Sequence, residues 1–436
     1  MALGGGTFLV QNKILPGTYI NFVSIPRPSN IFGDRGYAAV ALELDWGDPL
    51  ITTVEPADLQ KDALKLFGYS YTDERLRPIR EIMKHASTAY IGRLNGDGEK
   101  AKASLEGLTI EAKYPGTRGN DLTIVVENEV LDTGNFVVKT MLDGLEVDRQ
   151  IVAKSEDLKE NAFVTFTGNA ELKVNAGLKL TGGTTNEVSK EAHTKFLDEL
   201  EKYYVNTVGY VGVDEQLKSL YAEYAKRLRD KEGTKLQVVL YGDKKENNEA
   251  VISIDTEADE FAPGLVYWVT GAEAGCPVNK SLTNRRYDGE YTVSKGYKQR
   301  DLIKLLQEGK LVFHTVDKEV RILEDINSFT EFEPEKNEDF SKNQVIRVID
   351  QTAMDFAKIF NTKYLGKVPN DPEGRISLWN DFVKHAETLQ KIRAIQNFVP
   401  EDITVMQGDE KGAVYVEFRI QPTMAMTKLY VVVRIA

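Results

Sequence analysis

The sequence predicts a multidomain α+β protein. We expect an α/β core with a mostly parallel sheet, an inserted all-β sandwich-like domain, and a C-terminal α/β domain with extended terminal arms. The chain has 436 residues, which at roughly 150 residues per domain corresponds to about three domains. Residues 96–187 are rich in strand-like runs separated by Asp-Gly and Gly-Asn turns, whereas helical and strand-like runs alternate after Gly183.

The composition indicates a folded globular protein, with 42% hydrophobic and 28% charged residues. Acidic residues outnumber basic ones by 67 to 55, which argues against general binding of nucleic acid or of an anionic membrane, because both need a basic footprint. Aliphatic runs such as Val431–Val433 are far shorter than the ~20 apolar residues that cross a bilayer, so membrane insertion is not expected. The N-terminus has no basic or long apolar leader, and the single cysteine, Cys276, cannot form an internal disulfide, so we expect folding in a reducing cytoplasm.

The first 95 residues are expected to form an extended arm over residues 1–20 and a small α/β domain over residues 21–95. The arm has little helical period and a Pro-Gly turn signal at Pro16. The apolar spacing in the small domain predicts a strand, two helices and a short strand, in the order Tyr37–Leu42, Ala57–Phe67, Leu76–His85 and Ala89–Ile91.

Residues 96–187 are the predicted all-β insertion. Its clearest strand-like runs are Leu122–Val126, Asn135–Thr140 and Phe163–Phe166. The insertion holds 10 basic and 16 acidic side chains, so half of the chain's negative balance of −12 lies here. A module that faces water is the expected explanation.

An α/β domain is predicted over residues 188–330, because helices and strands alternate there. Its predicted helices are Ala192–Tyr203, Leu217–Leu228, Phe261–Ala274 and Asp301–Gln307. Its predicted strands are Asn206–Val211, Lys235–Tyr241, Ala250–Ile254 and Leu311–His314. This order implies a largely parallel sheet covered by helices.

A final domain is predicted over residues 331–436, beginning with an acidic, proline-containing connector over residues 331–342. Two helices and two strands are expected after it, at Val348–Phe360, Ile376–Ile395, Tyr415–Ile420 and Leu429–Ile435. The terminal strand is expected to form part of an arm that starts near residue 422.

No catalytic, cofactor-binding or metal-binding constellation is predicted, so we expect no enzyme activity. The phosphate loop, the G-x-S-x-G elbow and H-E-x-x-H are all missing from the sequence. Asp132-Thr133-Gly134 matches the aspartic-protease tripeptide, but that chemistry needs a second carboxylate and no second copy occurs, so a hairpin turn is expected. Neither Cys276 nor the histidines belong to a nucleophile or metal pattern, and those histidines are His85, His193, His314 and His385.

The segment Asn370–Gly374 could suggest a cation loop. It lacks the remaining oxygen ligands of a calcium loop and contains a proline. A surface turn before a helix is therefore expected, with Asp371 near the N-terminus of that helix.

An ordered set of motifs in residues 190–436 resembles the sheath proteins of contractile phage tails. In order, these motifs are Gly271–Gly275 with Asn279–Thr283, Gly309–Val312 with Ile326–Thr330, Arg347–Asp350, Tyr364–Asp371 with Gly374-Arg375, and Gln421–Tyr430. The N-terminal half is similar to the family in layout only. The resemblance implies a subtilisin-like fold for the α/β domain, but the motifs of a protease triad are missing from the sequence, so no protease activity is implied.

The resemblance implies a structural subunit that polymerises helically around a tail tube and contracts to drive the tube through the target cell envelope. The implied partners are further copies of the same chain, the tail tube protein, and baseplate and tail-terminator proteins. The implied location is the tail of a virion or phage-tail-like particle that is assembled in the bacterial host cytoplasm. Two alternatives stay open: the sheath of a phage-like bacteriocin or secretion apparatus, and a hydrolytic α/β enzyme with a β accessory domain.

The family's termini are implied to add strands to the sheets of neighbouring subunits. The candidate residues for this strand donation are Phe8, Leu9, Val10, Leu429, Tyr430, Val431, Val432 and Val433. A strand of about eight residues at ~3.3 Å per residue spans roughly 26 Å, enough to lie along a neighbour's sheet. The alternation of the C-terminal run equally fits a strand paired within its own chain.

Two sets of charged residues are candidate contacts. Residues 276–310 hold 8 basic and 4 acidic side chains, whereas residues 316–340 hold 3 basic and 9 acidic ones, so the two runs could meet between copies. The candidate lattice contacts are Arg285, Arg286, Lys295 and Lys298. For tube contact the resemblance points to the C-terminal domain, where the candidates are Arg375, Lys384, Lys391 and Arg393. Solvated surfaces would explain both sets equally well.

Overall fold

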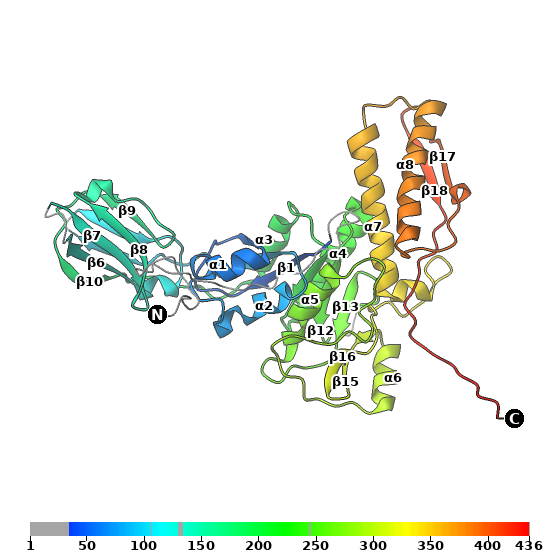
Figure 1. Ribbon diagram of the computed structural model, residues 1–436, viewed down its shortest axis with the longest axis horizontal. Helices are drawn as coiled ribbons and strands as arrows, with labels where there is room; N and C mark the ends of the chain where they lie inside the picture. The colour runs from blue at the N-terminus through cyan, green and yellow to red at the C-terminus, as the bar shows by residue number, and fades with distance from the viewer. Residues whose placement is uncertain (1–34, 106, 130–133, 244–245, 436) are drawn as a thin grey trace, which may run out of the picture. The chain divides into compact units, whose positions relative to one another are not determined.

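The computed structural model describes residues 35–105, 107–129, 134–243 and 246–435 (Figure 1). The expected arm over residues 1–20, with Phe8, Leu9 and Val10, lies outside the described residues, as does most of the Asp132-Thr133-Gly134 tripeptide. The described residues divide into two compact units. One comprises 39–83 with 88–204, and the other 35–38, 84–87 and 205–435.

The second unit contains a sheet with the strand order β14-β13-β12-β11, and in the first unit β3 lies between β1 and β2. These strands are β1 (Tyr37–Leu42), β2 (Ile51–Val54), β3 (Thr88–Arg93), β11 (Thr207–Tyr210), β12 (Gln237–Tyr241), β13 (Val251–Ile254) and β14 (Lys310–Leu311). In the second unit, β11 to β14 pair in parallel, whereas β2 and β3 of the first unit are antiparallel. The predicted parallel pairing is confirmed for β11 to β14, whose residues are buried almost without interruption, as in sheets covered on both faces.

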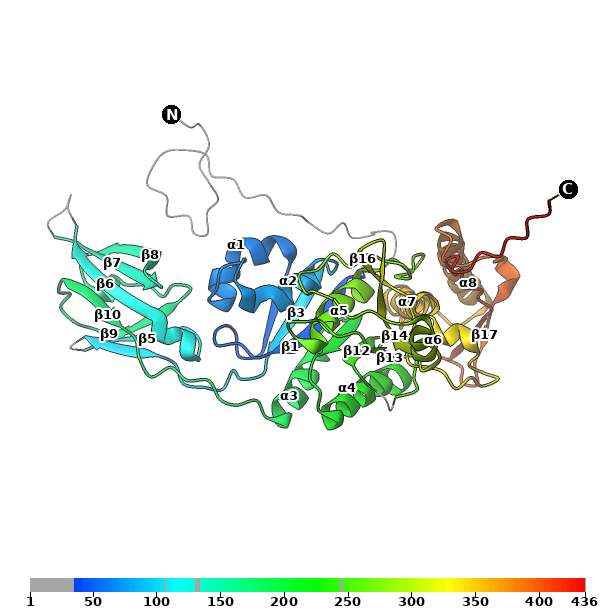
Figure 2. The same ribbon diagram turned by 90° about the horizontal axis from the view of Figure 1, so that it is seen from below.

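Two helices cover opposite faces of β11 and β12, as Figure 2 shows: α4 (Glu215–Arg227) and α5 (Leu265–Gly275). Successive residues of β11 point to opposite faces, so Gly209 lies against α5 and Tyr210 against α4. A Cβ added at Gly209 would lie 2.4 Å from the Thr270 hydroxyl oxygen, so only glycine allows this approach. On the other face, the Tyr210 ring stacks on Tyr221 at a centroid distance of 4.8 Å.

Two elements of this unit differ from the predictions. The helix predicted at Phe261–Ala274 begins with a 3-10 turn at Ala262–Gly264, because Pro263 fits the first turn, where no intrahelical donor is needed. The strand predicted at Leu311–His314 is divided at Val312. Its first part is β14, and its second part is β15 (Phe313–Val316), which pairs with β16 (Glu319–Ile322), while α6 (Gln299–Gln307) precedes β14 as predicted.

The helices of the first unit follow the sequence pattern. α1 (Pro56–Phe67) ends at Gly68, whose φ of 74° is the left-handed conformation that commonly terminates helices. The second predicted helix is shorter than expected and forms α2 (Arg77–Met83), and the helix after the insertion is α3 (Lys190–Leu200).

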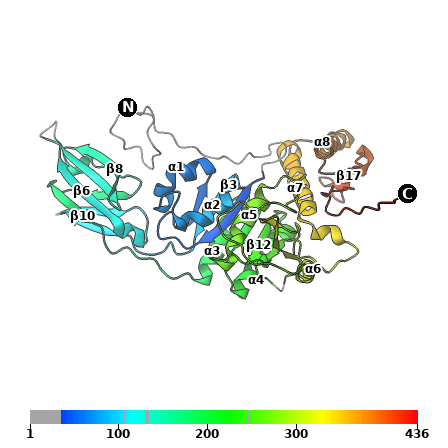
Figure 3. The same ribbon diagram turned by 60° about the horizontal axis from the view of Figure 1, so that its bottom comes forward.

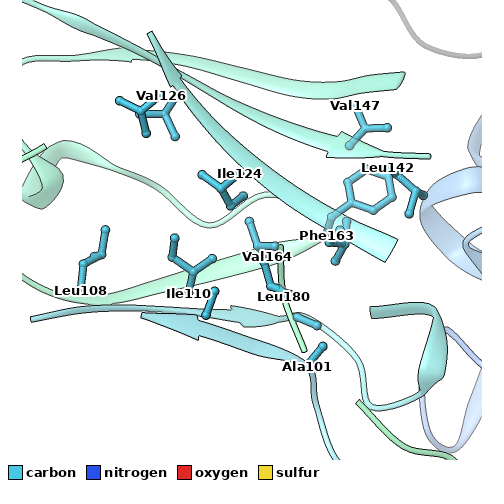
Figure 4. Packing of buried hydrophobic residues seen from close by; sticks show 14 of the residues in the cluster. Ala101, Leu108, Ile110, Ile124, Val126, Leu142, Val147, Phe163, Val164 and Leu180 are labelled. Carbon is cyan, nitrogen blue, oxygen red and sulfur yellow. The ribbon is translucent and has the colours of Figure 1, made fainter. Parts of the chain in front are cut away.

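The predicted all-β insertion consists of a four-stranded and a three-stranded antiparallel sheet. The first has the order β10-β6-β7-β8 and the second β4-β5-β9. Their bounds are β4 (Lys102–Leu105), β5 (Leu108–Ala112), β6 (Leu122–Asn128), β7 (Phe136–Leu142), β8 (Leu145–Val152), β9 (Val164–Gly168) and β10 (Asn175–Lys179). Figure 4 shows the apolar side chains that fill the space between the sheets, among them Ile110, Ile124 and Val164, each no more than 1% exposed.

The C-terminal part of the second unit holds α7 (Asn343–Ile359), α8 (Pro372–Lys391), and a hairpin of β17 (Ile403–Gln407) with β18 (Val414–Phe418) (Figure 3). The two helices pack through Phe356 and Phe382, whose rings stack at 4.0 Å. The expected turn before α8 is confirmed, because Asp371 Oδ1 accepts the Gly374 amide hydrogen at 2.7 Å as an N-cap.

The helix predictions for this part are wrong in their bounds. α7 starts five residues earlier than Val348. α8 starts at Pro372 rather than Ile376 and stops at Lys391 rather than Ile395, shortly before Arg393 takes a left-handed φ of 62°. The strand predicted at Leu429–Ile435 does not form within the described part of this chain. No helix among the described residues combines the length and apolarity that crossing a bilayer requires.

Candidate subunit interface

The C-terminal segment is attached to its domain as far as Ala425. The Thr423 amide donates to the Ala394 carbonyl at 2.9 Å, and the Gln396 amide donates to the Gln421 carbonyl at 2.9 Å. The side chain of Gln344 adds two hydrogen bonds, one to the Thr423 carbonyl and one from the Ala425 amide. Beyond Ala425, the segment makes no hydrogen bond with the rest of the described chain.

The free part of this segment is strongly apolar and almost fully exposed. The exposed fraction is 88% for Leu429, 87% for Tyr430, 84% for Val432 and 95% for Ile435, with Val431 at 68% and Val433 at 78%. Figures 1 and 2 show residues 426–435 as an extended trace. Apolar side chains and free backbone groups on one extended segment form a template for strand pairing. The described residues provide no partner strand for it in its own chain.

The hairpin of β17 and β18 is a sheet with free edges. One face packs inward, where the Trp379 indole donates to the Ile403 carbonyl at 2.8 Å and Phe418 stacks on Phe356 at 5.6 Å. The other face exposes Met406 and Tyr415, which lie opposite each other in the antiparallel register. Among the described residues, neither strand has a second neighbour. The Ile403 carbonyl at the edge of β17 is already bonded to Trp379, so the edge of β18 is the more open one for strand addition.

A buried polar network connects α5, the residues before Ile326, and α7. Arg347 of α7 lies between two carboxyl groups and contacts Asp325 Oδ2 at 2.6 Å and Glu273 Oε2; all three side chains are 1% exposed. Asn343 donates to Glu273 at 3.1 Å and to Asp325 at 3.0 Å. Nearby, Arg229 forms a bidentate pair with Asp350 at 2.7 and 2.8 Å.

The electrostatics of this network favour one ionised carboxyl group beside Arg347. Burial, reinforced by Asp325, raises the pKa of Glu273 well above its usual range and so favours its protonated form. Burial also opposes ionisation of Asp325, but Arg347 outweighs it and lowers the pKa of that carboxyl. The Arg347 cation therefore faces one anion, Asp325, and the network connects α5 to α7 within one subunit. Burial also raises the pKa of the adjacent Cys276 thiol to about 12, which makes it a poor nucleophile.

The structure divides the four lattice candidates into two pairs. Arg286 contacts Glu319 at 3.0 Å and Lys295 approaches Glu257 at 3.6 Å, so both have acidic partners in their own chain. Arg285 and Lys298 are exposed and form no ion pair within the described residues.

The four tube candidates do not share one surface. Lys384 and Lys391 are exposed and seven residues apart on α8, so they lie on one helix face. Arg375 precedes Lys384 by nine residues, which places it on the opposite face, and its guanidinium bonds the Asn370 carbonyl at 3.1 Å. Arg393 lies beyond the end of the helix.

Two of the four histidines, His85 and His385, contact neighbouring side chains within the fold. The His85 imidazole contacts Asp288 at 3.0 Å and the Trp268 ring edge-on, while His385 lies 3.5 Å from Asp355 between α7 and α8. In the part of the chain that the structure describes, no three His, Cys, Asp or Glu side chains converge as a metal site requires.

Known protein families match most of this chain. The family model of the phage tail sheath protein beta-sandwich domain matches residues 96–189, that of the central domain matches 186–328, and that of the C-terminal domain matches 335–436. Phage-like element PBSX protein XkdK of Bacillus subtilis is 31% identical, over 98% of this chain and 99% of that protein.

Solved structures agree with these matches. A sheath tail protein from Desulfitobacterium hafniense is 37% identical, with a TM-score of 0.80 over 93% of this chain and 96% of that one. The sheath of an extracellular contractile injection system (PVC) in the contracted state shares the fold, with a TM-score of 0.54 at 10% identity over 97% of this chain and 98% of that one. The chain belongs to the phage tail sheath protein family.

Proposed function

We propose that this structural subunit polymerises as stacked helical rings around a tail tube and contracts to drive the tube through a target envelope. The exposed apolar segment from Leu429 to Ile435 carries the proposal, because a subunit with an unpaired apolar strand is completed by a second chain. Membership of the sheath family, whose fold is shared by a contracted injection-system sheath, supports it.

The C-terminal segment adds to the β17–β18 sheet of a neighbouring copy. Residues 428–435 would span about 26 Å and the five-residue strands β17 and β18 about 17 Å, so the segment can cover a whole edge. Main-chain hydrogen bonds would supply affinity, and alternate apolar side chains would supply register. Phe8, Leu9 and Val10 remain candidates for a second donated strand.

Contraction is a change between two helical lattices of nearly rigid subunits joined by these strands. The buried network around Arg347 supports rigidity within a subunit, since its charges are satisfied inside one chain. If contraction buried about 200 Å² more apolar surface per subunit, the gain would be at most roughly 5 kcal/mol at ~25 cal/mol per Å². Such a bias, repeated along a polymer, needs no nucleotide.

Charged contacts and partners complete the proposal. Arg285 and Lys298 are the better lattice candidates, because Arg286 and Lys295 already have acidic partners. Lys384 and Lys391 form the proposed tube-facing pair. The tube, baseplate and tail-terminator proteins are the proposed partners, and the host cytoplasm is the proposed place of assembly. The similarity to XkdK favours a phage-like particle.

The finer architecture is also part of the proposal. We keep the boundaries expected from the sequence: an arm over 1–20, domains over 21–95, 96–187 and 188–330, and a C-terminal domain over 331–436. The family-model ranges 96–189, 186–328 and 335–436 support the last three. The α/β domain is proposed to be subtilisin-like without protease chemistry.

Electron microscopy of the purified chain tests this function. We expect rings or tubes from the full chain and dispersed subunits from a variant that lacks residues 426–436. A full chain that stays monomeric at high concentration would contradict the proposal. Turnover of a substrate that is lost on replacing one Asp, Ser or His would instead favour the hydrolytic alternative.

A further inference from the structure

Gln344 contacts the C-terminal segment where the segment leaves its domain. Its carboxamide nitrogen donates to the Thr423 carbonyl at 3.0 Å, and its carboxamide oxygen accepts from the Ala425 amide at 3.0 Å. A carbonyl and an amide two residues apart point to the same side of an extended strand, and one residue of a neighbouring strand would satisfy both. The amide group of Gln344, with one donor side and one acceptor side, takes the place of such a residue.

Over the part of the chain that the structure describes, main-chain hydrogen bonds fix the segment only as far as Thr423, whereas the bond to Gln344 reaches Ala425. The Thr423 amide is also bonded to the Ala394 carbonyl, so Thr423 is fixed twice. The Ala425 amide is bonded to Gln344 alone within the described residues. The next residue, Met426, is 101% exposed. In the described chain, the bond from the Ala425 amide to Gln344 is therefore the last hydrogen bond between the domain and the segment.

Gln344 is itself firmly placed. It is 5% exposed and lies in the first turn of α7, between Asn343 and Arg347 in sequence. Both of these neighbours belong to the buried network with Glu273 and Asp325. The contact with the segment is therefore made from a helix turn that the buried network holds in place.

We propose that Gln344 is a positioning residue for strand donation: it anchors the segment at Thr423–Ala425 and makes Met426 the first free residue. This inference rests on the proposed function, with the sheet edge of a second copy as the partner. The anchored arm, residues 426–435, reaches about 33 Å when extended. Loss of the anchor would free two further residues and add roughly 7 Å of slack between neighbouring subunits.

The test compares Gln344→Met, which keeps the side-chain length and removes both hydrogen bonds, with Gln307→Met, an exposed glutamine at the end of α6. Amide exchange is measured on unassembled subunits. In Gln344→Met we expect about tenfold faster exchange at Ala425, because one ordinary hydrogen bond is lost there. We expect little change at Thr423. Gln307→Met should match the parent chain. Unchanged exchange at Ala425 in a folded Gln344→Met variant would overturn the anchor.

Polymer order is the second measurement. Ala425→Pro removes the backbone N–H that donates to the Gln344 carboxamide oxygen and leaves α7 unchanged. This variant therefore remains informative if Gln344→Met fails to fold. We expect both variants to give fewer and less regular tubes than Gln307→Met. Regular tubes from Ala425→Pro would overturn the positioning role. Tubes from a chain without residues 426–436 would instead refute strand donation, while the exchange result would still report on the anchor.

Discussion

The network around Arg347 and the segment after Ala425 show opposite distributions of polarity. In the network, a guanidinium and two carboxyl groups are 1% exposed. In the segment, aliphatic and aromatic side chains such as Tyr430 and Ile435 are 87% and 95% exposed. The buried charges are satisfied inside one chain, whereas the exposed apolar residues need a second chain. Substitutions in the network should therefore change the stability of one subunit, and substitutions in the segment should change only assembly.

The largest loss of stability is expected from Arg347→Leu. This change leaves the buried, ionised Asp325 without its cation, which should lower the free energy of unfolding by about 3–5 kcal/mol. Denaturant unfolding of the monomeric subunit measures the loss. The exposed Lys391→Leu is the control and should stay within about 0.5 kcal/mol. Equal values for the two variants would mean that the network does not stabilise the subunit.

The two carboxyl groups of the network should differ. Burial favours the protonated form of Glu273, so Glu273→Gln, which puts a neutral group in its place, should cost less than about 1 kcal/mol. Asp325→Asn removes the anion that faces Arg347 and should cost about 2 kcal/mol more. Unfolding of both variants at pH 7.5 makes the comparison. A greater loss for Glu273→Gln would reverse the assignment of the charges.

A smaller, pH-dependent gain is expected at Asp355 of α7. Burial raises its pKa to about 6, although Gln351 and Lys358 act in the other direction, and His385 faces it from α8. The folded state thus holds the proton of Asp355 more tightly than the unfolded state, and the contribution of Asp355 to stability falls as pH rises from about 4 to 6. Asp355→Asn should stabilise the subunit by about 1–2 kcal/mol at pH 7.5 and have little effect at pH 4. An equal gain at both pH values would exclude ionisation of Asp355 as the cause.

The smallest effect on stability is expected in the segment. Replacing both Val431 and Val433 by Lys should change the free energy of unfolding by less than about 0.5 kcal/mol, because both side chains are exposed in the subunit. Assembly, measured by sedimentation, should nevertheless be lost. Val174→Lys with Leu145→Lys adds the same charge at sites that are 57% and 53% exposed in the insertion, and should leave assembly intact. Equal assembly by both double variants would remove the segment from the interface.

Turn chemistry explains which strands could be predicted. The hairpin of β7 and β8 turns at Asp143-Gly144, a sequence that favours positive φ, and the insertion was predicted from such signals. The hairpin of β15 and β16 turns at Asp317-Lys318 with φ values of 49° and 67°. Lysine rarely adopts this conformation, so β16 left no turn signal in the sequence.

The candidate interface was predictable only in part. The apolar run at Leu429–Val433 indicated a strand, but its lack of an intrachain partner depends on the whole topology. Glu273 and Arg347 belong to motifs that carry the family resemblance, yet Glu273, Asp325 and Arg347 are too far apart in sequence for local patterns to join them. The first turn of α7 was missed because Asn343 and Gln344 are polar, and Gln344 carried no signal at all.

Amide exchange of residues 429–434, measured in the unassembled subunit and in the polymer, tests the central claim most directly. We expect fast exchange throughout the segment in the subunit, and protection of at least every second amide by more than about a hundredfold in the polymer, as strand pairing requires. Protection already present in the unassembled subunit, or fast exchange throughout the segment in the polymer, would contradict donation of this strand between subunits.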